Sequence, residues 1–141
     1  MRLAEKLRLE LGVGLLSISV LEDGGRRLRT LVNAGDLAPG YAREPLDEGY
    51  ETDAFPTVAG LMRGRSYVFS AVEDSDISSA ALAFSFRVAC QAGAPIMVDG
   101  EVWGELWIGD RDASTAFDST LLAALEAAAA RAATALVADE A

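Results

Sequence analysis

Two turn signals, each lying between strand-forming residues, constrain the fold of this chain most strongly. The pair Asp99-Gly100 interrupts the stretch 86–109, and Glu22-Asp23-Gly24-Gly25 interrupts the stretch 15–32. Asp-Gly and Gly-Gly pairs between alternating apolar residues are typical of β-hairpins, whose two strands are antiparallel. The sequence therefore predicts two hairpins. A parallel sheet is not expected, because strands and crossover helices do not alternate along the chain.

Helical patterns lie at both ends of the chain. Leu3, Leu7 and Leu11 share one face of a helix over 2–11, which Gly12 and Gly14 should end. Asp118 is expected to cap a last helix that runs to about Val137, rich in alanine on the face away from its leucines. Both helices therefore carry an apolar stripe suited to packing on a sheet.

The middle of the chain mixes short elements with loops. Pro56 fits the first turn of a short helix to Arg63, which Gly64 ends before a brief strand over 66–69. Asp74 should cap a second short helix through about Phe84. The Gly- and Pro-rich stretch 33–52 is expected to be a loop.

These elements predict a single α+β domain over 1–141, with a central antiparallel sheet flanked by helices. In the last hairpin, Gly93 suggests a bulge and Pro95 limits pairing. The strand 101–109 carries bulk on both faces and should be covered on both sides. One face holds Val102, Leu106 and Ile108, and the other holds Trp103, Glu105 and Trp107.

Composition narrows the classes of function. Cys90 is the single cysteine, so no internal disulfide can form, and a reducing cytoplasm is the expected compartment. The net charge of −10 disfavours nucleic acid and anionic lipid as partners. No segment fits a signal peptide or a membrane span. Arg26, Arg27 and Arg29 are expected to form a charged hairpin edge, with an anion site as the alternative.

The segment Ala94-Pro95-Ile96-Met97-Val98-Asp99-Gly100-Glu101-Val102-Trp103-Gly104-Glu105-Leu106 resembles the signature hairpin of GAF domains, a PAS-related architecture. Phe117-Asp118 and the helix that follows resemble the closing segment of the same family. The resemblance implies terminal helices on one face of the sheet and a small-molecule pocket on the other. Family members bind cyclic nucleotides, tetrapyrroles, haem or small metabolites, or nothing, and many dimerise through their terminal helices.

Histidine is absent, which removes Ser-His and Cys-His catalysis, the common metal triad and the usual axial ligand of haem. Covalent bilin attachment of the phytochrome type usually pairs a cysteine with a neighbouring histidine. The branch of the family that reduces methionine sulfoxide needs a second cysteine. We therefore expect no catalytic residue, metal or cofactor. Cys90 is expected to be a buried structural thiol, and a reactive sensor thiol is the alternative.

Aromatic residues gather in the segments that the resemblance places around the pocket. They suit an apolar cavity with a few polar contacts, and Arg87 suits an anionic or polar end of the ligand. A filled core is the alternative. The candidate ligand-binding residues are Phe55, Tyr67, Phe69, Asp74, Phe84, Arg87 and Cys90.

The sequence thus predicts a ligand-responsive regulatory domain in signal transduction, which is not an enzyme. It should form a homodimer through its first and last helices, because Leu3, Leu7 and Leu11 supply an apolar stripe and the alanine surface lets another helix approach closely. Two alternatives remain open. One is a dimerisation module with a filled pocket, and the other is a small-molecule redox enzyme that uses Cys90.

Overall fold

The computed structural model describes residues 2–69 and 87–140. Its centre is a six-stranded antiparallel sheet with the strand order β3-β2-β1-β6-β5-β4. The predicted α+β class and the flanked antiparallel sheet are confirmed. The strands are β1 (Leu15–Glu22), β2 (Arg27–Gly35), β3 (Gly49–Glu51), β4 (Tyr67–Phe69), β5 (Cys90–Val98) and β6 (Glu101–Asp110).

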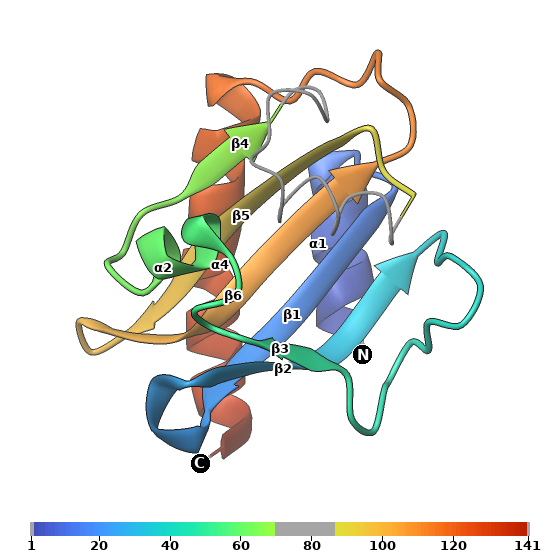
Figure 1. Cartoon of the computed structure of the whole chain (residues 1–141). Coiled ribbons are helices and arrows are strands. Elements are labelled where there is room, and N and C mark those ends of the chain that lie inside the picture. The colour runs from blue at the N-terminus through green and yellow to red at the C-terminus, as the bar shows by residue number, and fades with distance from the viewer. Residues whose placement is uncertain (1, 70–86, 141) are drawn as a thin grey trace.

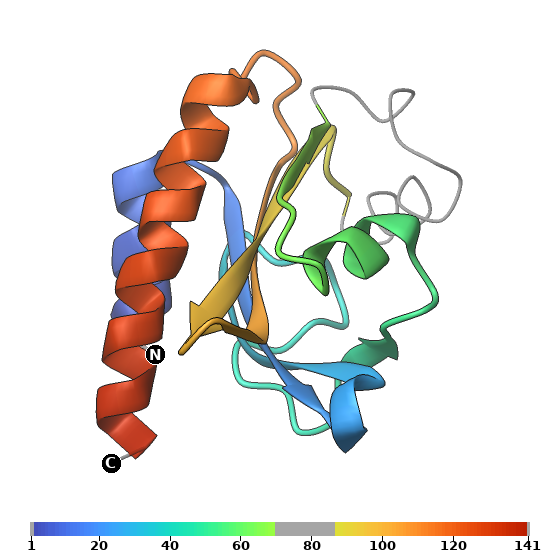
Figure 2. The ribbon, with the colours of Figure 1, turned by 90° about the vertical axis from the view of Figure 1, so that its left-hand side faces the viewer.

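The two long helices, α1 (Arg2–Leu11) and α4 (Ser119–Glu140), cover one face of this sheet. The short helix α2 (Pro56–Leu61) lies on the opposite side, which Figure 2 shows to the right of the sheet. We call the face covered by α1 and α4 the helix face, and the opposite one the α2 face. The two faces bury different chemistry, as described below.

Both predicted hairpins form. At the β5–β6 turn, Asp99 and Gly100 have φ angles of 53° and 80°, the left-handed pair that a two-residue hairpin turn requires. At the β1–β2 turn, Asp23–Gly25 form a short 3₁₀ turn in the predicted position. Because β1 pairs with β6 as well as β2, the two hairpins join into one continuous sheet.

The last hairpin differs from the prediction in two details. Its register shift lies between Ile96 and Met97, not at Gly93. At Gly93 the ring of Tyr67 crosses the strand so closely that an added Cβ would lie 2.5 Å from Tyr67 Cε1. Gly93 therefore leaves room for the Tyr67 ring in this position, and no bulge lies there.

Several boundaries also differ. Strand β2 continues to Gly35 and the stretch 33–52, expected to be a loop, contains β3. Strand β5 starts at Cys90, because residues 87–89 are not in the sheet and Phe86 lies outside the described residues. The expected helix capped by Asp74 and ending near Phe84 also lies outside the described residues. Helix α2 has Pro56 in its first turn, as predicted.

The main core lies between the sheet and the helix face. It contains Leu7 of α1, Leu16 and Ile18 of β1, and Leu106 and Ile108 of β6. Trp103 packs against this core, while Trp107 lies in a separate cluster with Leu15 and Val88. The prediction that Trp103 and Trp107 share one side was therefore wrong, because the irregular register opposite residues 96–97 interrupts the simple alternation.

Helix α4 begins as predicted, with the Asp118 carboxylate accepting a hydrogen bond from the Leu121 N–H at 3.0 Å. Its residues Leu125, Ala128, Ala132 and Leu136 are buried against the sheet. Ser119–Ala138 is also long and apolar enough to cross a membrane by length and composition. Core helices of globular domains meet the same criterion, so this is weak evidence for a membrane span.

Candidate functional site

The α2 face of the sheet is lined by buried polar side chains, in contrast to the apolar helix face. Along the strands, these polar residues alternate with apolar residues that point into the core on the helix face, or they pair with another polar residue on the α2 face. The buried polar residues are Ser17, Ser19, Thr30, Asn33, Gln91 and Glu105, with exposed fractions of 8% or less. Buried polar groups are tolerated where they form hydrogen bonds with one another.

Most of this polar surface is internally paired. Ser17 Oγ donates to Asn33 Oδ1 at 2.5 Å, and Asn33 Nδ2 donates to Ala42 O at 2.9 Å. Trp107 Nε1 donates to Gln91 Oε1 at 3.1 Å. These hydrogen bonds fix the orientation of the polar side chains on the α2 face, so their arrangement is part of the folded structure.

Glu105 is different, because it lies near the middle of the sheet and only one of its carboxylate oxygens is paired. Tyr50 donates its hydroxyl hydrogen to Glu105 Oε1 in a short hydrogen bond, while Oε2 has no partner among the described residues. Burial raises the pKa of Glu105 to about 7. Burial, together with the charge of Glu105, also holds the pKa of Tyr50 well above its usual value.

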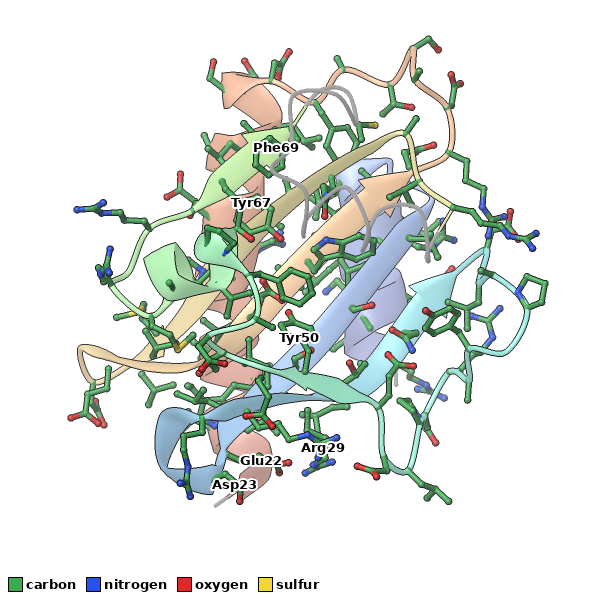
Figure 3. All side chains as sticks on the ribbon, in the orientation of Figure 1. Glu22, Asp23, Arg29, Tyr50, Tyr67 and Phe69 are labelled. Atoms are coloured by element: carbon green, nitrogen blue, oxygen red, sulfur yellow. The ribbon has the colours of Figure 1, made fainter. Side chains whose placement is uncertain are left out.

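The Tyr50–Glu105 bond reveals the shape of the sheet. Tyr50 belongs to the edge strand β3 and Glu105 to β6, and β2 and β1 lie between these strands in the sheet order. The two side chains meet only because the β3 edge curls over the α2 face. In Figure 3, Tyr50 points from β3 toward the middle of the sheet.

Further aromatic rings gather around Tyr50, the partner of this carboxyl group. Tyr50 and Phe55 stand edge to face with ring centroids 5.2 Å apart, and Tyr67 and Phe69 lie 5.6 Å apart on β4. Figure 3 places Tyr67 and Phe69 above Tyr50 on the same side of the sheet. Tyr50, Phe55 and Tyr67 pack against the small apolar cluster of Leu28, Val58 and Leu61.

The structure thus brings together three of the predicted site residues, Phe55, Tyr67 and Phe69. Arg87 is exposed in the segment before β5, with a φ of 58°. Its predicted contact with an anionic group stays a prediction. Asp74 and Phe84 lie outside the described residues.

Cys90 does not belong with these residues. It is buried in the core of the helix face, on the opposite side of the sheet from Tyr67. Its Sγ lies 3.7 Å from Asp110 O, and burial raises the pKa of the thiol to about 11. The prediction of a buried thiol is confirmed. The described residues place Cys90 in a different core cluster from the predicted site residues Phe55 and Tyr67.

Sequence reasoning missed Tyr50 and Glu105 as partners. Tyr50 lies in a stretch expected to be a loop. Glu105 did carry a signal, because it is an acidic residue in a strand expected to be covered on both faces. The signal that one of its oxygens is unpaired exists only in three dimensions.

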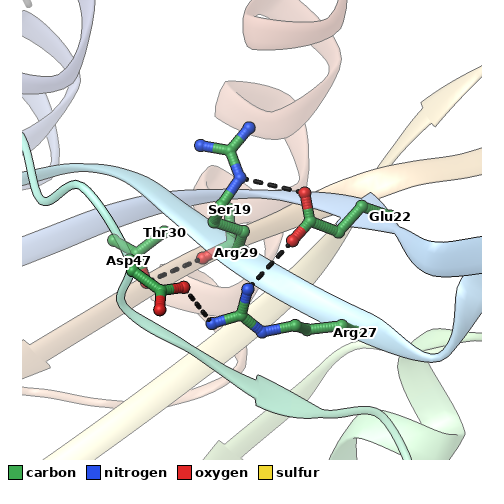
Figure 4. A network of polar contacts seen from close by, with 6 residues as sticks. All are labelled: Ser19, Glu22, Arg27, Arg29, Thr30 and Asp47. Carbon is green, nitrogen blue, oxygen red and sulfur yellow. Dashed lines mark hydrogen bonds and ion pairs between the residues drawn. The ribbon is translucent and has the colours of Figure 1, made fainter.

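The arginine cluster of the first hairpin is occupied by ion pairs. Glu22 pairs with both Arg27 and Arg29, at 3.1 and 2.9 Å, and Arg27 also reaches Asp47 at 2.8 Å. Figure 4 shows this network beside the Ser19–Thr30 pair. The charged hairpin edge was expected. Arg27 and Arg29 already have anionic partners, and Arg26 Nε donates to the backbone oxygen of Asp23 at 3.1 Å.

Hollows elsewhere on the described surface differ in character from the aromatic cluster. One of about 580 Å³ lies between α1 and β2 and is lined by Glu5, Arg8 and Arg43 among others. Arg8 is already paired with Glu5, and Arg43 donates to Gly35 O at 3.0 Å. The polar groups of this hollow therefore satisfy one another.

A curled antiparallel sheet, with terminal helices on one face and a polar, aromatic surface on the other, defines a two-faced α+β domain. A family profile for the GAF domain matches residues 2–136. The chain belongs to the GAF domain family. No curated protein sequence matches it.

Solved structures agree with this fold at low sequence identity. A red/green cyanobacteriochrome, NpR6012g4 in its red light-absorbing state, superposes with a TM-score of 0.77 at 14% identity, covering 97% of this chain and 90% of that one. The GAF domain of an Acinetobacter phosphoenolpyruvate-protein phosphotransferase gives 0.71 at 13%, covering 97% and 79%. Residues 122 to 287 of a methyl-accepting chemotaxis protein give 0.71 at 20%, covering 96% and 84%. At these identities the likeness establishes the fold alone.

Proposed function

We propose that this chain is a sensory or regulatory domain that responds to a small molecule bound on the α2 face. The observation that carries the proposal is the buried, half-paired carboxyl group of Glu105, whose partner Tyr50 packs in one cluster with Phe55 and Tyr67. A domain that only needed a core could fill this position with an apolar residue at lower cost, since an unpaired buried polar group destabilises the fold. The similarity to domains of photoreceptors and of a chemotaxis protein supports a role in signalling.

The ligand need not be that of the relatives. One similar structure, the far-red absorbing dark state of JSC1_58120g3, contains bound biliverdin. In the present chain the single cysteine is buried in the core of the helix face, and histidine is absent. We therefore expect noncovalent binding, and we expect no catalysis.

Native mass spectrometry of freshly purified protein tests the proposal. A retained small molecule, or a melting shift in a metabolite screen, is expected for a sensor, because ligand at a hundredfold excess over its dissociation constant stabilises the native state by about 2.7 kcal/mol. The screen is repeated on Phe69→Ala and on Leu9→Ala, an exposed control on α1. A domain with no retained mass and no shift would be the filled dimerisation module instead.

We propose further that the domain works as a homodimer through its terminal helices. The outward face of α4 exposes Ala123, Ala127, Ala130 and Thr134, spaced by four, three and four residues. This spacing places them at successive a and d positions of a heptad pattern. Small residues there let a second helix approach closely.

The charges beside this stripe favour a parallel pair of helices. Glu126 then occupies a g position and Arg131 the following e position, and both are exposed. In a parallel pair, the g residue of one helix meets the next e residue of the other, and opposite charges there set the orientation. Within one chain Arg131 bonds to Glu10 of α1 at 2.7 Å, an exposed pair that a partner could replace.

Light scattering at micromolar concentration should give twice the chain mass. A mass that stays monomeric over the whole accessible concentration range would contradict the dimer while leaving the ligand proposal in place. The two proposals therefore fail independently of each other.

A further inference from the structure

Among the described residues, one buried side-chain oxygen has no hydrogen-bond partner, Oε2 of Glu105. The side chain is 1% exposed, and none of the ion pairs of the described residues includes it. A buried carboxyl group in a native fold normally has partners for both oxygens. The unpaired oxygen therefore marks a position where a donor is missing.

The surroundings define what that donor could be. The cross-strand neighbours of Glu105 are Ser19 on β1 and Pro95 on β5. Ser19 Oγ is directed to Thr30 at 3.5 Å, and proline has no N–H to donate. The titratable groups described on this side include Tyr50, which is bonded to Oε1, and Tyr67, whose charge interacts with that of Tyr50. Glu48 also lies on this side and accepts a hydrogen bond from Asn33 Nδ2 at 3.2 Å. Within the described ranges, the carboxylate is bonded to the hydroxyl of one aromatic residue, Tyr50, and no cation pairs with it.

Tyr50, whose hydroxyl occupies one oxygen of the carboxyl group, belongs to a very short strand. Tyr50 reaches Glu105 from β3, a strand of three residues that pairs with β2 only, through residues 27–29. A short edge strand of this kind can separate locally at much lower cost than an interior strand. If the Tyr50 ring moved away, both oxygens of the Glu105 carboxylate would become accessible to a ligand. A flat ligand ring could then stack beside Phe55 and Tyr67, which pack in the same cluster as Tyr50.

Electrostatics favour a cation at this position. The whole chain carries a net charge of −10, which raises the local concentration of cationic ligands. Aromatic faces also attract cations. The predicted cationic contact, Arg87, is exposed, whereas the Glu105 side chain is 1% exposed.

We propose that Glu105 selects the ligand of the α2 face, and that this ligand is a flat aromatic cation with N–H donors, of the aryl amidine type, which replaces the Tyr50 hydroxyl on the carboxylate. This inference rests on the proposed function, because it names the ligand class of the same site. It predicts that charge and N–H donors, not apolar area alone, decide binding.

Benzamidine, benzamide and benzoate are matched probes, because they share the ring and differ in charge. Calorimetric titration and melting shifts at millimolar probe should detect benzamidine binding, with benzamide and benzoate weaker by at least about tenfold, the range of a charge-assisted hydrogen bond. Glu105→Gln should weaken benzamidine by about tenfold or more. Glu101→Gln, which removes an exposed carboxylate from the same strand, should leave it unchanged.

Two further measurements separate recognition from a structural effect. Tyr50→Phe removes the competing hydroxyl donor and should tighten benzamidine. Below about pH 7 the affinity of the parent for benzamidine should fall by up to tenfold per pH unit, since the carboxyl group must release its proton. Glu105→Gln should lack this dependence, and its melting curve reports whether it is folded.

The outcomes distinguish this inference from the proposed function. Equal binding of benzamide or benzoate, unchanged benzamidine affinity in Glu105→Gln, or no benzamidine binding would each overturn the ligand class. A retained native ligand whose binding depends on Phe69 but not on Glu105 would leave the sensory function standing. Benzamidine binding that depends on Glu105 and follows the pH supports both.

Discussion

Single residues show how this domain departs from simple core packing. The Glu105 carboxyl group keeps its proton to about pH 7 in the folded chain, whereas an ordinary glutamic acid loses it near pH 4.5. Between these values the folded state binds more protons than the unfolded state, so stability falls as pH rises through this window. The difference corresponds to about 3 kcal/mol above pH 7.

Glu105→Gln should therefore be more stable than the parent above pH 7, by up to about 3 kcal/mol, and nearly equal to it below pH 4.5. Glutamine keeps an acceptor for the Tyr50 hydroxyl and carries no charge. Urea unfolding of both proteins at several pH values measures the difference directly. A constant difference across this range would mean that Glu105 does not titrate as a buried group.

Cys90 illustrates the opposite case, a residue whose chemistry burial suppresses. With a pKa of about 11 and a fully buried side chain, it should react with thiol reagents in the native state only as fast as the domain opens. Cys90→Ser should cost about 1–3 kcal/mol if its hydroxyl, on a shorter bond than the thiol, does not reach Asp110 O, and Cys90→Ala should cost less. Rapid labelling of folded protein would support the redox alternative.

At the scale of elements, the joining of the two hairpins depends on a close approach of strands. Strand β6 lies beside β1 and approaches it closely at Gly104, where an added Cβ would lie 2.0 Å from the backbone oxygen of Ser19. A backbone atom cannot rotate away as a side chain can. The glycine of the family-like hairpin is thus explained by packing between strands.

Gly104→Ala should destabilise the domain by at least about 2 kcal/mol, since it forces the central strands apart. Gly60→Ala is the matched control, because Gly60 lies in α2 with its nearest neighbour at 3.9 Å and an ordinary φ. There alanine should stabilise by up to about 1 kcal/mol through helix propensity. Thermal unfolding of both variants compares them, and equal effects would contradict the packing argument.

At the scale of the whole molecule, the proposed homodimer would place α4 against α4 of a second copy. In the proposed parallel pair, Ala123 and Thr134 each face their own counterpart. Single variants Ala123→Cys and Thr134→Cys should both form interchain disulfides on mild oxidation, whereas the exposed loop control Ala113→Cys should not. An antiparallel pair would instead give a disulfide only in a mixture of the two variants.

Charge reversal tests the same orientation without cysteine chemistry. Glu126→Arg and Arg131→Glu should each weaken the dimer through like charges, and the double variant should restore it. Glu10→Gln controls for the loss of the intrachain partner of Arg131 and should leave the dimer intact. A double variant no tighter than either single one would argue against this register.

The candidate site could be predicted only in part. Phe55, Tyr67 and Phe69 can be identified from the sequence because the family resemblance places their segments around the pocket. Cys90 is among the predicted ligand-binding residues as well. On strand β5, however, adjacent residues point to opposite faces, so Cys90 enters the helix-face core while Gln91 lies on the α2 face.

The sequence by itself determined the local architecture: the terminal helices, the two hairpins with their turns, and the buried state of the single thiol. These depend on periodicity, capping and turn residues that act over a few positions. The tertiary structure decided that the β3 edge curls over the sheet, that Tyr50 meets Glu105, and that one carboxylate oxygen stays unpaired. Those features join residues 55 positions apart, and such a contact depends on the curvature and order of strands, which no local pattern encodes.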